Sequence, residues 1–202
     1  MIFLLLMIFL FIGISSLETY GLLNFANFSD PNAPASSDFE MTIIYASAGL
    51  GGLTFLAQIV LAISVSMWMY RANANLRSFG QRNLEYTPGW CAGWWFIPLM
   101  NLFKPYSAMK EIFENSSTLA KRDGVVATGV IGGWWACWLI GGFVTRIETR
   151  MQLQGIDLGS AQLLVTWLST ILTVGAAVLL INIMSRVSDW QETHTSGLTK
   201  TS

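Results

Sequence analysis

The feature that most constrains this chain is the stretch 41–70, which contains no charged side chain. A helix needs about 20 predominantly apolar residues to cross the hydrocarbon core of a bilayer, and this stretch is longer. Three more stretches, at about 2–23, 125–145 and 163–184, are apolar and long enough. We therefore predict four transmembrane helices, the second of which extends beyond the bilayer.

The composition supports a membrane protein. Hydrophobic residues make up 53% of the chain and charged residues only 11%, whereas a soluble domain carries about 25% charged residues. A net charge of −1 offers no basic surface for nucleic acid. One His and two Cys are too few to suggest a metal site or a bound cofactor. The expected fold class is an all-α, polytopic helical membrane protein that has membrane lipids and not nucleic acid as partners.

The first stretch, 2–23, has a second interpretation as a cleavable signal peptide, because it is apolar and near the N-terminus. It lacks the basic segment that begins such peptides. We therefore expect it to be a transmembrane helix. Residues 1–190 then form a single helical membrane domain, and residues 191–202 a polar tail.

The distribution of Lys and Arg predicts the orientation. The loop 24–40 has neither, whereas the segment 71–124 has seven. These seven residues are Arg71, Arg77, Arg82, Lys104, Lys110, Lys121 and Arg122. Because cytoplasmic loops carry the excess of basic residues, this segment and both termini are expected in the cytoplasm, under the inner membrane.

Residues 88–106 do not fit a cytoplasmic loop, since they include Trp90, Trp94 and Trp95 among other apolar residues. The segment is short for a full crossing, and Pro98 removes a backbone donor in its middle. We expect a re-entrant or interfacial hairpin that enters the inner leaflet and packs beside the inner end of the second helix. Asn101 has a side chain suited to bond a freed backbone group or to cap the next helix.

Before the hairpin, residues 71–79 are expected to extend the second helix into the cytoplasm. Gly80 follows where a helix often ends in a residue with positive φ.

Short motifs around the hairpin carry a family resemblance. They are Arg71-Ala72, Asn75-Leu76, Gly80, Pro88-Gly89-Trp90, the run from Gly93 to Pro98, Asn101-Leu102, Pro105-Tyr106, Met109, Glu111-Ile112 and Ser116. This pattern, densest over residues 68–117, resembles the bacterial membrane family called domain of unknown function 4328. Phe113 stands where the family pattern has Trp. The resemblance implies a polytopic membrane protein and implies no activity, substrate or cofactor.

Polar residues around the hairpin are the candidate ligand or lipid site. They are Arg71, Asn75, Trp94, Asn101, Lys104, Tyr106 and Glu111. Polar groups near lipid often mark a binding site, and Arg71 with Lys104 and Lys110 suits an anionic head group. The structural alternative is that Arg71 extends to the interface, the amides bond backbone, and Glu111 is solvated.

Small residues suggest where helices approach closely. Gly89 and Gly93, and Gly129 and Gly133, form small-x-x-x-small pairs. Packing within one bundle is the simpler interpretation, and homo-oligomerisation is the alternative.

Three classes of function remain open. We favour a non-catalytic component that packs against other membrane subunits. The alternative is a protein that binds or transports a lipid or small molecule, which a cavity lined by Asn75 and Asn101 would favour. An intramembrane enzyme is the third class, and it has only Tyr106, Ser107, Glu111 and Cys91 as candidate groups, without a neighbouring His.

Overall fold

The computed structural model describes residues 38–120, 127–154 and 160–199, and every regular element in these ranges is helical. The predicted first span, 2–23, lies outside the described residues. The chain divides into two compact units, Met1–Val65 and Ser66–Ser202. The candidate site and the contacts described below lie within the second unit.

Among the described residues, three helices are long and apolar enough to cross a membrane. The candidate spans are Gly51–Ser78, Gly129–Met151 and Leu164–Gly197. They lie in helices α2 (Asp38–Ser78), α5 (Ala127–Leu153) and α6 (Ser160–Thr199). The second, third and fourth predicted spans thus coincide with long apolar helices, which supports a membrane protein.

The end of α2 confirms the expected extension and its termination at glycine. The helix continues to Ser78, and Gly80 has a φ of +89°. The N–H of Gly80 donates to the carbonyl of Arg77 (3.1 Å), and the N–H of Gln81 donates to that of Leu76 (3.1 Å). This pair of hydrogen bonds is the Schellman motif. The motif needs one residue in the left-handed backbone conformation, which glycine adopts most readily.

The segment 88–106 is a chain of short helical pieces and not one continuous helix. It contains α3 (Pro88–Gly93) and the 3-10 turns η1 (Trp94–Phe96) and η2 (Met100–Leu102). Between the turns, Ile97 is extended, with φ −101° and ψ 110°. The ring of Pro98 disfavours the helical conformation in the residue before it, which explains the break.

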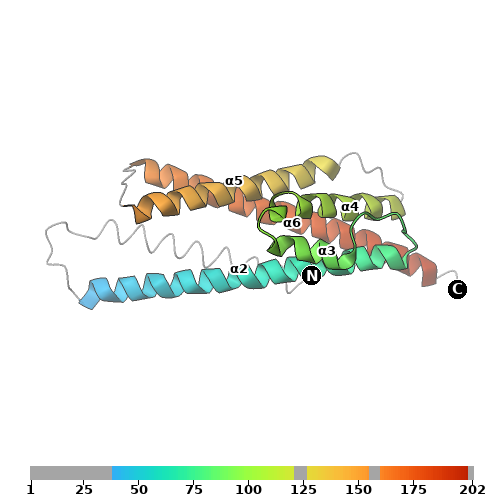
Figure 1. Ribbon diagram of the computed structural model, residues 1–202, viewed down its shortest axis with the longest axis horizontal. Coiled ribbons are helices and arrows are strands. Elements are labelled where there is room, and N and C mark those ends of the chain that lie inside the picture. Colours follow the sequence, from blue (N-terminus) through green and yellow to red (C-terminus); the bar gives the residue numbers. More distant parts are fainter. Residues whose placement is uncertain (1–37, 121–126, 155–159, 200–202) are drawn as a thin grey trace. The chain divides into compact units, whose positions relative to one another are not determined.

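Helix α4 (Lys104–Leu119) follows the hairpin and carries the core of this unit on one face. Met109, Ile112, Phe113 and Ser116 are fully buried and recur at the three- and four-residue spacing of a helix face. Helix α4 packs against α5 and α6, which lie side by side along their lengths (Figure 1).

Helix α6 continues well beyond the predicted span 163–184, into the residues expected to form a polar tail. Its face toward the core is formed by Leu180, Ile183, Met184, Val187 and Gln191, all buried. This stripe keeps helical spacing past the apolar sequence as far as Gln191, where α6 packs against α4 and is hydrogen-bonded to α2. The helix itself continues to Thr199.

Candidate functional site

A network of side-chain amides joins three helices at the end of α2. The Nδ2 of Asn75 donates to the Oε1 of Gln191 on α6 (3.0 Å). The Nε2 of Gln191 in turn donates to the carbonyl of Ala72 (3.1 Å) and to the Oγ of Ser116 on α4 (3.0 Å). Gln191 is only 5% exposed. Both N–H donors and the oxygen of its amide are therefore used within the protein, which fixes α2 and α6 in register.

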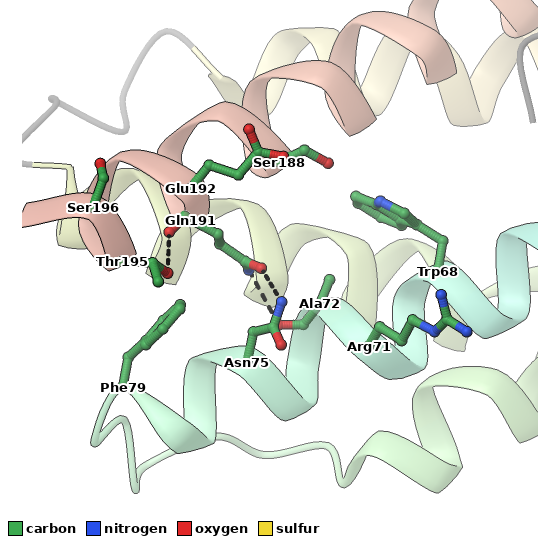
Figure 2. Close-up of a pocket in the computed structure, with 10 residues that line it drawn as sticks. All are labelled: Trp68, Arg71, Ala72, Asn75, Phe79, Ser188, Gln191, Glu192, Thr195 and Ser196. Carbon is green, nitrogen blue, oxygen red and sulfur yellow. Dashed lines mark hydrogen bonds between the residues drawn. The ribbon is translucent and has the colours of Figure 1, made fainter. Parts of the chain in front are cut away.

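A groove with a volume of about 740 Å³ lies next to this network, between α2 and α6. Its ten lining residues come in equal number from the two helix ends (Figure 2). They are Trp68, Arg71, Ala72, Asn75 and Phe79, and Ser188, Gln191, Glu192, Thr195 and Ser196. The spacing of three and four residues on each wall places these side chains on one helix face. The groove therefore has two parallel helical walls and a floor of hydrogen-bonded amides.

The walls of the groove carry opposite charges. Arg71 projects from α2 and Glu192 from α6, and both are exposed. Within the described residues, no ion pair joins either of them to another side chain. Arg71 is also the first charged residue after the uncharged stretch 41–70. The groove thus begins where an apolar span ends and offers one cation and one anion to a ligand.

An aromatic contact lies at the end of the groove where Phe79 is a lining residue. The rings of Phe79 and His194 meet edge to face, with centroids 4.9 Å apart. The Oγ1 of Thr195 donates to the carbonyl of Gln191 (3.0 Å), so this hydroxyl is held against α6. His194, expected in a solvated tail, instead packs against the end of α2.

A second set of contacts fastens the loop between α2 and α3. Arg77 donates from Nη2 to the carbonyls of Tyr86 (2.9 Å) and Leu84 (3.4 Å), and from Nε to the Oδ1 of Asn73 (3.2 Å). The Nδ2 of Asn73 also donates to the carbonyl of Tyr86 (3.1 Å). From the other side, the carboxylate of Glu111 accepts the backbone N–H groups of Glu85 and Tyr86. We call these residues the loop clasp.

Lys104 belongs to the same region. Its Nζ donates to the hydroxyl of Tyr86 (3.4 Å), lies 3.9 Å from Glu85 Oε1, and faces the rings of Tyr86 and Trp94. Lys110 lies 3.8 Å from Glu114 on its own helix. Neither lysine lines the groove, so the structure does not place Lys104 and Lys110 there with Arg71. The lysines interact with acidic and aromatic neighbours, whereas Arg71 is exposed.

The hairpin is packed by aromatic rings. The indole of Trp95 meets those of Trp135 and Trp138 on α5 edge to face, at 6.2 Å and 5.8 Å between centroids. Its Nε1 donates to the Sδ of Met69 (3.2 Å), and Trp135 donates from Nε1 to the carbonyl of Leu102 (3.3 Å). The contact with Met69 confirms that the segment 88–106 packs beside the predicted inner end of the second span.

Asn101 does not cap the following helix. Phe103 occupies the N-cap position of α4 without a side-chain hydrogen bond, and the Oδ1 of Asn101 is buried without a hydrogen-bond partner. Asn101 lies within η2, where its backbone N–H donates to the carbonyl of Ile97 (2.8 Å). It therefore lies two residues before the N-cap position, which Phe103 occupies. The aromatic ring of Tyr106 lies beside Trp135, with 6.3 Å between centroids, away from the groove.

In the part of the chain that the structure describes, the pKa values of Cys91 and Glu111 are shifted, and both residues belong to the region of the loop clasp. Burial, reinforced by the negative charge of Glu111, raises the pKa of the Cys91 thiol to about 12. Burial also raises the pKa of Glu111, despite the two backbone N–H groups that stabilise its carboxylate. A protonated, buried thiol is a poor nucleophile. In the described ranges, no three His, Cys, Asp or Glu side chains gather as metal ligands do.

The glycine pairs differ in what they contact. A Cβ added at Gly133 would lie 3.6 Å from Leu179 on α6, whereas one added at Gly89 or Gly129 would meet nothing within 4 Å. Gly93 faces Trp90 within its own segment. Among the described glycines, the closest such contact is at Gly141 on α5, where an added Cβ would lie 3.3 Å from the Cβ of Leu172 on α6.

Sequence reasoning selected Arg71 and Asn75 correctly as neighbours but missed Asn73, Arg77 and Gln191. The signal for Gln191 was present, because it follows Met184 and Val187 at helical spacing on the buried face of α6. A polar residue that continues an apolar stripe is a candidate for a buried hydrogen-bonded group.

A family model described as "Domain of unknown function (DUF4328)" matches residues 39–189. The match confirms the resemblance. It includes all the lining residues from the α2 side of the groove and, from α6, Ser188 alone. Neither the curated proteins nor the solved structures contain a match to the chain.

Proposed function

This chain belongs to the DUF4328 family, and from that premise and the groove between α2 and α6 we propose that it is a non-catalytic membrane protein that binds a lipid head group. The observation that carries the proposal is the position of the groove at the end of an uncharged span. If the uncharged span lies in the bilayer, the groove lies at the membrane surface, where the head group of a lipid can enter it while the acyl chains stay in the bilayer. The proposed function corresponds to the ligand-binding alternative of the sequence analysis.

The residues at the membrane end of the groove suit the interface. Trp68 is partly buried and precedes Arg71 by one helical turn. Tryptophan prefers the level of lipid head groups, and arginine extends its charged end to the same level. A phosphate there meets a guanidinium with five N–H donors, which suits phosphate oxygens.

The floor of the groove is already ordered before a ligand arrives. Asn75 and Gln191 are bonded to each other, and Gln191 is further fixed to α2 and α4. A preorganised site loses little conformational freedom on binding, which favours affinity. The volume of about 740 Å³ also lies in the usual range for small-molecule sites.

The proposed setting is a bacterial inner membrane with four spans, both termini in the cytoplasm, and the hairpin 88–106 inserted into the inner leaflet. The exposed tip of the hairpin supports this placement, because Phe96, Leu99 and Phe103 are 63%, 73% and 68% exposed. Apolar surface of this kind requires a lipid or protein cover. Cysteines introduced at Lys104 and Leu99 test the topology: Lys104→Cys should react only with reagent inside the cell, and Leu99→Cys should resist membrane-impermeant reagent from both sides.

The lipid proposal is tested by measuring lipid retained by the purified full-length protein. Arg71→Gln should lower the phospholipid bound per protein in native mass spectra. Arg186→Gln is the matched control, since Arg186 is an exposed arginine on α6 that does not line the groove. Equal retention by the two variants contradicts the proposal.

The second candidate function is an accessory component of a membrane complex. The exposed hairpin tip favours it as well, because another subunit covers such a surface as effectively as lipid does. Native electrophoresis after mild extraction separates the two functions. Migration within a larger complex, lost in a Leu99→Ser and Phe103→Ser double variant, supports the accessory role.

A further inference from the structure

We propose that the head group bound in the groove is zwitterionic and carries a primary ammonium, as in an ethanolamine phospholipid. The phosphate lies against Arg71 and the ammonium against Glu192. This inference rests on the proposed function and adds to it the chemical class of the ligand.

The charges on the two walls carry the argument. Arg71 on α2 and Glu192 on α6 both line the groove, and no ion pair between them is present. An anionic head group such as phosphatidylglycerol satisfies Arg71 but brings its phosphate near the Glu192 carboxylate. A zwitterion places opposite charges on both walls at once, so the charge of the groove complements the whole head group.

The order of the two charges along the helices agrees with the order of groups in the lipid. Gln191 bonds to Ala72 and Asn75, and this sets the neighbouring Glu192 beside that level of α2. Arg71 begins the same turn, nearer the uncharged span. A phospholipid likewise presents its phosphate next to the glycerol and its ammonium two carbons further out. The Glu192 carboxylate therefore lies further from the uncharged span than Arg71 does, as the ammonium of the lipid lies further from the glycerol than the phosphate does.

The remaining polar groups distinguish a primary ammonium from a choline. Ser188 precedes Glu192 by four residues, so its hydroxyl lies on the same face of α6. A primary ammonium has three N–H donors for such oxygens, whereas a quaternary ammonium has none. Recognition of a quaternary ammonium instead uses a cage of aromatic rings. The aromatic side chains among the described lining residues, Trp68 and Phe79, are eleven positions apart on α2 and do not form one.

The test uses the full-length protein in detergent and three lipids with identical acyl chains: phosphatidylethanolamine, phosphatidylglycerol and phosphatidylcholine. Native mass spectrometry measures the fraction bound at equal lipid concentration. We expect about fivefold tighter binding of the ethanolamine lipid than of either other lipid, the size of one exposed ion pair. Glu192→Gln should remove this preference, and Asp189→Asn, which changes an exposed carboxylate outside the groove, should retain it.

The two levels of the proposal fail in different ways. If Arg71→Gln weakens all three lipids while Glu192→Gln leaves their order unchanged, the ethanolamine assignment is overturned and the lipid groove stands. If neither substitution changes binding of any lipid relative to Asp189→Asn, the groove does not bind lipid and both proposals fall. Thermal unfolding of each variant confirms that differences in binding do not arise from loss of the fold.

Discussion

Asn75 donates a hydrogen bond to Gln191 across a sequence separation of 116 residues, with Nδ2 and Oε1 at 3.0 Å. The bond connects the end of α2 to the part of α6 that follows its apolar sequence. Since Gln191 also bonds Ala72 and Ser116, a single buried side chain holds three helices together beneath the groove.

Replacing Gln191 with Leu should destabilise the protein. The change leaves the fully buried Ser116 hydroxyl and the Asn75 amide without this partner, and we expect the free energy of unfolding to fall by about 1–3 kcal/mol. Asp189→Asn, on an exposed position two residues earlier, should change it by less than about 0.5 kcal/mol. Thermal unfolding in detergent measures both, and equal stability of the two variants contradicts the structural role of the network.

Arg77→Gln should release the loop that the loop clasp fastens. The substitution removes the guanidinium donors to the carbonyls of Leu84 and Tyr86. Arg82 lies exposed in this loop and is a trypsin site. We expect cleavage after Arg82 to become several times faster, because proteolysis requires local opening of the chain. Arg71→Gln removes an exposed arginine outside the loop clasp and serves as the control; an equal cleavage rate in the two variants contradicts the role of Arg77.

Glu111 should make stability depend on pH. Burial raises its pKa in the folded protein above the value of an unfolded chain. Its contribution is therefore fully present below the ordinary glutamate pKa and is lost as the pH rises through the raised pKa. Melting temperatures between about pH 4 and about pH 8 should show the wild type losing stability relative to Glu111→Gln as the pH increases. A difference that stays constant or grows with pH contradicts this direction.

Cys91 should resist thiol reagents while the protein is folded. With a pKa of about 12, only about one thiol in ten thousand is ionised at about pH 8, and the residue is fully buried. In a Cys137→Ser background, maleimide should label Cys91 only after denaturation. Ser188→Cys, placed in the groove in a Cys91→Ser and Cys137→Ser background, should be labelled in the folded protein. Rapid labelling of folded Cys91 contradicts its burial.

Gly141→Ala should weaken the packing of α5 on α6. An added Cβ would lie 3.3 Å from Leu172 Cβ, a backbone-attached atom that moves only with its helix. The expected cost is about 1–3 kcal/mol. Gly129→Ala, where the added Cβ meets open space, should be neutral or stabilising by up to about 1 kcal/mol. Thermal unfolding of the two variants compares them, and an equal loss of stability contradicts the close approach at Gly141.

The sequence alone was sufficient for the features that depend on neighbouring residues. Pro98 forces the break after Ile97 because its ring clashes with the preceding backbone, and Gly80 ends α2 because only glycine adopts its φ without strain. Long uncharged stretches likewise predicted α2, α5 and α6, because the bilayer selects for apolar composition along each segment separately.

The candidate site was predicted only in part, for a physical reason. Arg71 and Asn75 share a helix face, so their proximity follows from helical spacing. The groove also needs α6, and the sequence contains no local sign that Glu192 lines the same groove as Arg71. Asn101 failed as a cap because α4 begins at Lys104, with Pro105 in its first turn and Phe103 at the N-cap position.

The sequence by itself determined an all-helical protein suited to a membrane, with a helix stop at Gly80 and a break at Pro98. Only the tertiary structure decided which polar groups are buried and paired, because the three partners of Gln191 lie 75, 116 and 119 residues away along the chain. Composition and steric limits act on each segment alone. A hydrogen bond between helices forms only when folding has brought its donor and its acceptor together.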